Sequence, residues 1–132
     1  MKPKMIIPML VCRDAEAELN FCRNVFGAIE LSRRTSENGH VIHATLMIHE
    51  HMIMVHNETP HLASRAPQAD GSSPVVTYLY DENVDDIIDR AVVHGARVLL
   101  PAEDQFWGDR VGRIIDPSGH VWNIAARMDK AE

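Results

Sequence analysis

The sequence predicts an α+β fold built from two βαβββ modules. Residues 5–56 and residues 75–126 show the same order of patterns: an apolar strand, an amphipathic helix and three further strands. In each copy a capping residue, Asp14 or Asn83, precedes the helix, and a glycine follows it. Since one such half cannot cover its own sheet, we expect the two modules to form a curved mixed sheet around a cleft, with the helices outside.

The first module opens with residues 5–12 (MIIPMLVC), an apolar run that predicts a strand covered on both faces. Pro8 removes one backbone donor, which predicts a free edge or a bulge at that point. Between Asp14 and Gly27, apolar residues recur at helical spacing. Three more strands are expected at residues 28–34, 40–48 and 51–56, with a tight turn at residues 37–39 (ENG) before the second of them.

Residues 57–74 (NETPHLASRAPQADGSSP) are rich in Pro, Ser and Ala and predict a linker within a single domain of residues 1–132. The second module follows with a strand at 75–80 and a helix that Asn83 begins and Gly95 ends. Pro101 is expected to stop the next strand, 96–100. The last two strands are expected at residues 110–115 and 121–126, joined by the turn at 116–119 (DPSG).

Composition excludes several classes of function. Thirteen Lys and Arg against nineteen Asp and Glu give a net charge of −6, which argues against a nucleic-acid-binding protein. No apolar run approaches the ~18 residues of a membrane span, so we expect a cytoplasmic protein without a membrane partner. Cys12 and Cys22 have neither metal-site nor redox-motif spacing and are expected to be reduced packing residues.

Two segments of the second half carry a more specific signal. Residues 104–110 read DQFWGDR, and residues 116–125 read DPSGHVWNIA. In the first half, residues 26–28 read FGA and His43 begins the segment HATL. This pattern resembles the vicinal-oxygen-chelate superfamily, which includes glyoxalase I, extradiol dioxygenases and bleomycin- and fosfomycin-resistance proteins. Within it, the second-half motif looks like that of the PhnB-like branch.

The resemblance also implies where metal ligands would stand. Members that use a divalent ion carry ligands on the first and last strand of each module, and the corresponding positions here are Ile7, Met54, Val76 and Asn123. Three of them are apolar, so we expect no metal and no other cofactor. Six of the eight histidines lie between His40 and His61. Of these, His49 and His51 flank an expected hairpin turn and, like His40, are interpreted as polar surface residues with adventitious affinity for metals.

Strand alternation predicts which side chains line the expected cleft. In the second module, Trp122 and Ile124 are expected to pack under the helix. The lining residues expected on the cleft face are Val41, His43, Thr45, Met52, Met54, His56, Val76, Tyr78, Tyr80, Arg110, Gly112, Ile114, Val121, Asn123 and Ala125.

Some of these residues carry a functional hypothesis. His43 is the candidate for proton transfer, because a histidine pKa lies near neutrality, or else it is a core histidine held by Thr45. Arg110 would clamp a carboxylate or phosphate, or pair with Asp104 or Asp109. Predicted ligand contacts come from Thr45, Met54, Tyr78, Trp107, Arg110 and Asn123, with Trp107 as a lid, a stacking surface, a loop anchor or a dimer contact.

Three functions remain open at this point. The first is a metal-independent protein that binds a small organic molecule, with His43 as general acid and base if it is an enzyme. The second is a non-catalytic protein that sequesters an aromatic or antibiotic-like compound. The third is a metal-dependent lyase or dioxygenase, which would need His43 and His56 to form an ion site outside the positions that the resemblance implies. The resemblance also implies a homodimer.

Overall fold

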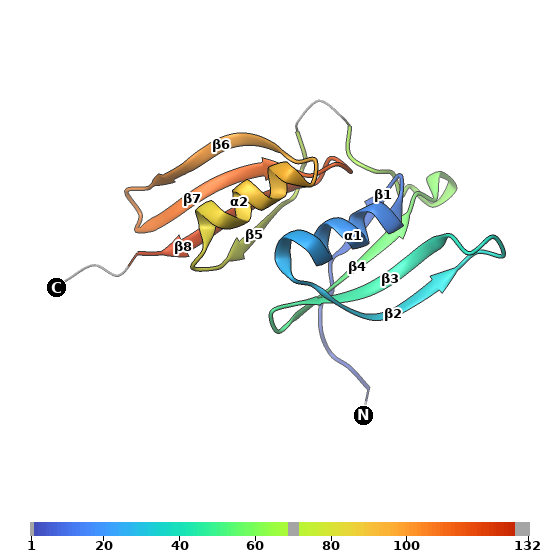
Figure 1. Ribbon diagram of the computed structural model, residues 1–132. Coiled ribbons are helices and arrows are strands. Elements are labelled where there is room, and N and C mark those ends of the chain that lie inside the picture. Colours follow the sequence, from blue (N-terminus) through green and yellow to red (C-terminus); the bar gives the residue numbers. More distant parts are fainter. Residues whose placement is uncertain (1, 69–71, 129–132) are drawn as a thin grey trace. The chain divides into compact units, whose positions relative to one another are not determined.

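The computed structural model describes residues 2–68 and 72–128, and the chain divides into two compact units, residues 1–66 and 67–132. Each unit holds one helix and a four-stranded mixed sheet, so the two predicted βαβββ modules are confirmed (Figure 1). The boundary between the units falls inside the predicted linker. Within the described part of the chain, no helix is long and apolar enough to cross a membrane.

In the first unit the sheet has the strand order β1-β4-β3-β2. The pair β1–β4 is parallel, and the other two pairs are antiparallel. A short 3-10 helix, Pro60–Leu62, follows within the predicted linker. The elements are β1 (Met9–Cys12), α1 (Ala15–Phe26), β2 (Ile29–Thr35), β3 (Val41–Ile48) and β4 (His51–Asn57).

Helix α1 begins and ends where the sequence predicts. The Asp14 side chain accepts hydrogen bonds from the first-turn amides of Glu16 and Ala17, and the Asn57 side chain accepts one from Ala15 at 2.8 Å. Gly27 ends the helix at φ 69°, a left-handed conformation that costs glycine little. The Asn57 contact ties the end of β4 to the start of α1.

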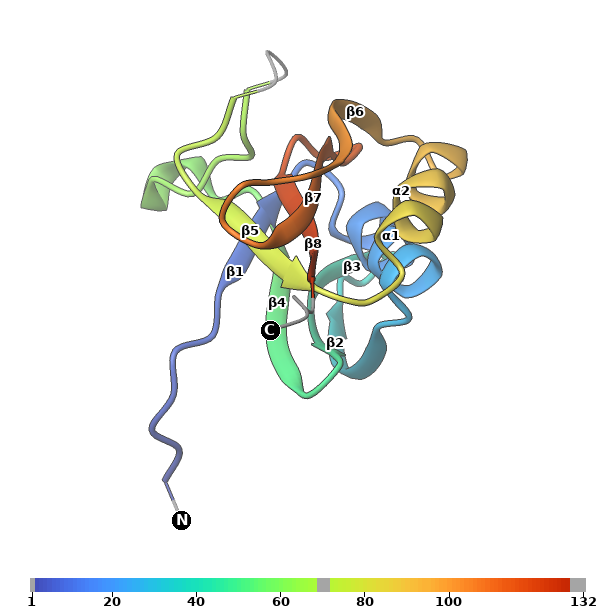
Figure 2. The same cartoon turned by 90° about the vertical axis from the view of Figure 1, so that its left-hand side faces the viewer.

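Strand β1 is shorter than predicted, because it starts at Met9 and not at Met5. The carbonyl of Pro8 accepts a hydrogen bond from the Met54 amide at 2.9 Å, but Pro8 has no amide hydrogen to donate in return. The ladder therefore stops there, and residues 2–8 extend away from the first sheet (Figure 2).

The second unit repeats this topology with the strand order β5-β8-β7-β6. The pair β5–β8 is parallel, and β8–β7 and β7–β6 are antiparallel. Helix α2 lacks a side-chain cap from Asn83, although Asp81 accepts a hydrogen bond from the Asn83 amide at 2.9 Å. The elements are β5 (Val76–Tyr80), α2 (Val84–Val93), β6 (Arg97–Asp104), β7 (Asp109–Ile115) and β8 (Val121–Arg127).

The prediction that Pro101 stops its strand is wrong, since β6 continues through it to Asp104. Strand β6 lies at the edge of its sheet and pairs only with β7. The register between them shifts between Leu100 and Glu103. An edge position next to a bulge tolerates a proline, because no neighbouring strand requires its missing donor.

One face of each sheet packs against the helix of its own unit (Figure 1). In the first unit this face carries Ala44, Leu46 and Val55, all fully buried. The two cysteines, Cys12 and Cys22, are not joined in a disulfide and are buried in the same layer between β1 and α1. The opposite face of each sheet is not covered by the helix of its unit, and we call it the helix-free face.

In the second unit the helix-covered face carries Trp122 and Ile124, as predicted. Asp116 in the turn before β8 fixes the indole: its carboxylate accepts hydrogen bonds from the amides of Ser118 and His120, each at 3.0 Å, and from Trp122 Nε1 at 2.9 Å. Because Asp116 is itself buried, these bonds are shielded from water.

The side chains of strand β7 lie on the opposite faces of the sheet from those predicted. A Cβ atom added at Gly112 would meet Ile88 of α2, so Gly112 lies on the helix-covered face. Ile114 pairs with Trp122 on that same face. The expectation that Arg110, Gly112 and Ile114 face away from the helix is therefore wrong. Alternation puts Val111, Arg113 and Ile115 on the helix-free face.

We expect Gly112→Ala to destabilise the protein by about 1–3 kcal/mol, because the added methyl group overpacks the contact with Ile88 and the backbone near Leu100. Urea unfolding of Gly112→Ala, of Ile88→Val and of the double variant would measure the loss of unfolding free energy in each. If the Ile88 contact is the cause, the double variant loses less than the sum of the two single variants. Additive losses would contradict the assignment.

Candidate functional site

The helix-free face of the first sheet is rich in histidine and methionine. Its register sets His43 opposite His56, Thr45 opposite Met54, and Met47 opposite Met52. The prediction that His43, Thr45, Met52, Met54 and His56 share one face is confirmed. All five residues are partly exposed, whereas Ala44, Ile53 and Val55, which lie between them on the two strands, are buried.

The two histidines contact each other directly. His43 Nδ1 lies 3.0 Å from His56 Nδ1, a hydrogen-bonding distance, and the rings meet edge to face with centroids 5.1 Å apart. Burial lowers the pKa of His43 most, and the neighbouring His56 and Arg34 lower it further. The folded protein therefore disfavours the protonated form of His43, and the hydrogen-bonding partner of this residue is His56 and not Thr45.

On the helix-free face of the second sheet, two tyrosines of β5 converge on one carboxylate. Asp109 accepts a hydrogen bond from the Tyr80 hydroxyl at 2.6 Å and another from the Tyr78 hydroxyl at 3.0 Å, both on Oδ2. Asp109 is 4% exposed, while Tyr78 and Tyr80 are 42% and 45% exposed. The buried carboxylate thus lies at the hydroxyl ends of two partly exposed tyrosines.

The Asp109 carboxyl is nevertheless held in its ionised form. The Tyr80 hydroxyl lowers its pKa most, Tyr78, Arg127 and the indole of Trp107 lower it further, and burial opposes them. Burial and the neighbouring negative charge raise the pKa of Tyr78, which keeps its hydroxyl a donor. The cluster is therefore one anion with several donors directed at it.

A polar pair that the sequence interpretation missed lies further along the same face. Arg113 Nε donates to Asn123 Oδ1 at 2.7 Å, and the two residues are register partners on β7 and β8. The terminal nitrogens of Arg113 make no hydrogen bond to any residue within 2–68 or 72–128. Asn123 takes its predicted face, and Tyr78 is its register partner on β5. The sequence did contain a signal for the correct face of β7. If Trp122 packs under the helix, its register partner Ile114 must do so too, which puts Arg113 on the opposite face.

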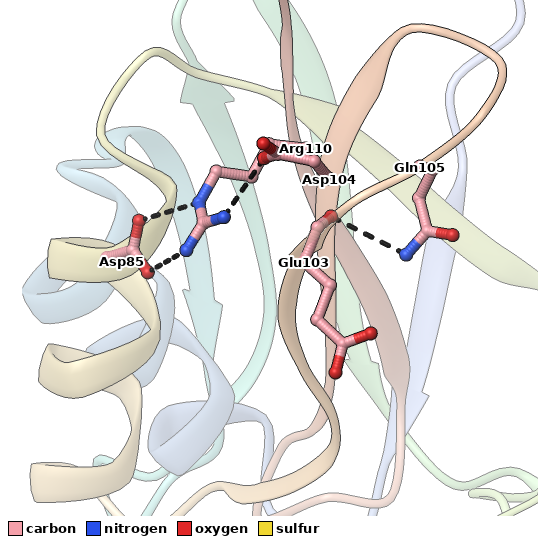
Figure 3. Close-up of polar contacts among 5 residues, drawn as sticks. All are labelled: Asp85, Glu103, Asp104, Gln105 and Arg110. Atoms are coloured by element: carbon pink, nitrogen blue, oxygen red, sulfur yellow. Dashed lines mark hydrogen bonds and ion pairs between the residues drawn. The ribbon is translucent and has the colours of Figure 1, made fainter.

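Arg110 lies on the other side of this sheet (Figure 3). Its guanidinium donates to both carboxylate oxygens of Asp85, at 2.9 and 3.0 Å, and to Asp104 at 3.0 Å. These carboxylates, Asp85 first, raise the pKa of Arg110. Arg110 thus joins the start of α2 to the end of β6, and Asp104, one of the two alternatives considered, is indeed a partner.

Trp107 lies in the tight turn between β6 and β7, which is closed by hydrogen bonds between Gln105 and Asp109 and from Gly108 to Gln105. Its ring is 55% exposed and contacts Phe106 edge to face at 5.0 Å. The indole belongs to the Asp109 cluster through its effect on that pKa. Tyr78 and Tyr80 thus meet at the Asp109 carboxylate, and Trp107 lies two residues before Asp109 in the adjoining turn.

Metal coordination has little support among the side chains. In the described residues, no group of three or more His, Cys, Asp or Glu side chains is placed to hold an ion. At the four positions where the resemblance implies ligands, Ile7, Met54 and Val76 offer no nitrogen or oxygen donor, and Asn123 already accepts from Arg113. These residues do not fit a divalent ion of the kind that carboxylates and imidazoles bind.

Comparisons with known proteins give consistent results. The family model described as the Glyoxalase/Bleomycin resistance protein/Dioxygenase superfamily matches residues 5–124. An uncharacterised protein of Mycobacterium bovis is 38% identical over 120 residues, which cover 89% of this chain and 79% of that protein. An uncharacterised protein of Mycobacterium tuberculosis is also 38% identical over 120 residues, covering 89% of this chain and 71% of its own length.

Two solved structures share the fold. TioX from Micromonospora sp. ML1 has a TM-score of 0.73 at 24% identity, with 96% of this chain and all of that chain covered. The fosfomycin resistance protein FosX from Listeria monocytogenes, complexed with Mn(II) and sulfate, has a TM-score of 0.68 at 16% identity, covering 96% and 93% of the two chains. At these identities the likeness shows the fold alone.

The histidine pair makes a testable prediction about pH. We expect NMR titration of the full chain to give His43 a pKa below its ordinary value of 6.5. Because the folded state disfavours protonated His43, its contribution to stability is complete above pH 6.5 and decreases as pH falls below that value. Replacing His56 with Gln should raise the pKa of His43, whereas His40→Gln, an exposed control, should leave it unchanged. Equal effects of the two variants would contradict the direct contact.

Proposed function

Because the chain belongs to the glyoxalase/bleomycin resistance protein/dioxygenase superfamily, we propose that it binds a small organic molecule on the helix-free faces of its sheets. The observation that supports this best is the grouping on the second sheet, where exposed tyrosine rings lie beside an ordered arginine–asparagine pair. Binding sites for small molecules commonly combine aromatic surface with a few fixed polar groups.

In this proposal, Arg113 and Asn123 orient the ligand. The bond from Arg113 Nε to Asn123 fixes the plane of the guanidinium, and its terminal nitrogens form a fork that suits a carboxylate or phosphate. Tyr78 and Trp107 supply stacking surface in the second unit. In the first unit, Thr45 and Met54 are the candidate ligand contacts on its own helix-free face. Arg110, the earlier candidate for the anion clamp, is assigned the structural link between α2 and β6.

We further propose that no divalent ion takes part. The support is the donor set described above, in which three of the four expected ligand positions are apolar. Catalysis would then depend on proton transfer. With Nδ1 of His43 directed at His56, Nε2 is the atom that would accept a proton from a ligand, and His56 would orient the ring. The lowered pKa of His43 supports the role of a base.

The alternative from a different class is sequestration without turnover, in the manner that the words "resistance protein" in the family description suggest. The exposed rings of Tyr78, Tyr80 and Trp107 support it equally well. Membership of the PhnB-like branch, supported by residues 104–110 and 116–125, is part of the proposal, as are a homodimer and a cytoplasmic location.

Binding can be tested on the full chain with metal-free bleomycin A2 and fosfomycin, the compounds named by the family and by a structural neighbour. We expect at least one to shift the methyl signals of Met52 and Met54 or the indole signal of Trp107 in NMR spectra. The indole of Trp122, buried on the helix-covered face, is the internal control. Shifts confined to Trp122, or none with either compound, would contradict the proposal.

Replacement of His43 separates the two classes once a ligand is found. If the protein is an enzyme that uses His43 as a base, His43→Ala should lower kcat by roughly two to four orders of magnitude. If the protein sequesters its ligand, the Kd should change little. His40→Ala serves as the matched control in both assays.

Metal independence has its own test. Untagged protein dialysed against Mn(II), Ni(II) or Zn(II) should retain well under one ion per chain, measured by mass spectrometry. One tightly held ion per chain that disappears in His43→Gln and His56→Gln would instead support the metal-dependent alternative.

A further inference from the structure

The Asp109 cluster has features that its structural role does not require. Two hydroxyls on a single carboxylate oxygen would anchor the turn even if the rings were covered. Instead the rings of Tyr78, Tyr80 and Trp107 are 42%, 45% and 55% exposed around a carboxylate that is 4% exposed. The Tyr78 and Tyr80 rings lie 5.3 Å apart at an angle of 41°. The anion lies at the hydroxyl ends of the two tyrosine rings, and exposed electron-rich rings beside a shielded anion can attract an organic cation.

The chain already places one cation in this position. The guanidinium carbon of Arg127 lies 5.4 Å above the centre of the Tyr80 ring, within cation–π range. Arg127 Nε is 3.9 Å from Asp109 Oδ1, which is too long for a hydrogen bond. The Arg127 side chain is 76% exposed. Tyr80 first, and then Asp109, raise the pKa of this mostly exposed guanidinium, so an incoming organic cation would compete with it for the same groups.

Neighbouring charges and geometry restrict what the cluster can accept. Asp109 and Arg113 stand four residues apart on one face of β7, a separation of about 13 Å at strand spacing, so the two charged groups lie apart although Tyr78 is the register partner of Asn123. The net charge of −6 favours the approach of cations to the chain as a whole. A bare metal ion is disfavoured here because only one carboxylate is present and the other groups are donors.

We propose that Asp109, Tyr78, Tyr80 and Trp107 form a site for the ammonium or guanidinium group of a small organic molecule, with Arg127 as an intramolecular competitor. The inference rests on the proposed function and specifies one end of the ligand. Choline and agmatine are suitable probes, since they carry a quaternary ammonium and a guanidinium group. The neutral control is 3,3-dimethylbutan-1-ol, which has the shape of choline without its charge.

Arg127→Met is the decisive variant, because a competitor and a structural partner predict opposite results. Removing a competing cation should tighten choline and agmatine binding by about two- to fivefold, the factor that corresponds to an exposed cation–π contact. If Arg127 merely holds the site together, the same change should weaken binding. The side chain is exposed, so the variant should fold normally.

The experiment is a calorimetric titration of the full chain, with the Trp107 indole signal followed by NMR in parallel. We expect choline or agmatine to bind and to shift Trp107, the neutral alcohol to bind at least fivefold more weakly, and Asp109→Asn to reduce cation binding at least tenfold. Tyr80→Leu, which removes the ring, should also weaken binding. Arg127→Lys, which keeps a cation, should not reproduce the gain seen with Met.

The inference is overturned if the alcohol binds as well as choline, if neither cation binds to the wild type or to Arg127→Met, or if Arg127→Met weakens binding. Its failure can be told apart from failure of the proposed function. If bleomycin A2 or fosfomycin shifts the Met52, Met54 or Trp107 signals and neither choline nor agmatine does, only the proposed cation site is wrong. If none of the four compounds shifts them, the binding proposal fails as well.

Discussion

The close approach of Gly112 to Ile88 is the contact on which the arrangement of the second module depends. Since residues on a strand alternate between faces, fixing Gly112 beneath α2 fixes every side chain of β7. It places Arg110 where it can reach Asp85 and places Arg113 beside Asn123. It also turns the Asp109 carboxylate towards the tyrosines of β5. The polar character of both faces of this sheet thus follows from one position without a side chain.

Local chemistry allowed much of the fold to be predicted from the sequence. The capping residue Asp14, the left-handed Gly27 and the turn at 116–119 each act within a few residues, and each took its expected role. The predicted strand ends were wrong where pairing with a neighbouring strand determines how far a strand extends. Pro101 was expected to end a strand, but an edge position needs no donor from it. Strand β1 starts later than predicted because Pro8 has no amide hydrogen to continue the pairing with β4.

The candidate site was partly predictable for the same reason. Residues 109–115 (DRVGRII) carry apolar residues at both odd and even positions, so alternation alone could not decide between Arg110 and Arg113. Register with β8 decides it, because Ile114 must accompany Trp122. The His43–His56 contact was closer to prediction, since a two-residue turn at 49–50 sets those histidines opposite each other. The convergence of Tyr78 and Tyr80 on Asp109 depends on packing between three strands, which no local pattern records.

The two modules share a topology but not a chemistry. The helix-free face of the first sheet holds histidine, threonine and methionine side chains around the His43–His56 contact, with Arg34 as the register partner of His43, whereas that of the second holds Asp109 and Arg113 in fixed hydrogen bonds. Duplication supplied the same scaffold twice, and side chains on alternate strand positions could then change without affecting the packed layer beneath the helix.

The positions of the cysteines and tryptophans allow the unfolding of each unit to be measured by a separate probe. Both thiols, Cys12 and Cys22, are buried in the first unit, and both indoles, Trp107 and Trp122, lie in the second. The rate at which a thiol reagent labels the protein therefore reports on opening of one half, while indole fluorescence reports on the other. The two signals together show, without any engineered label, whether the two units unfold together or separately.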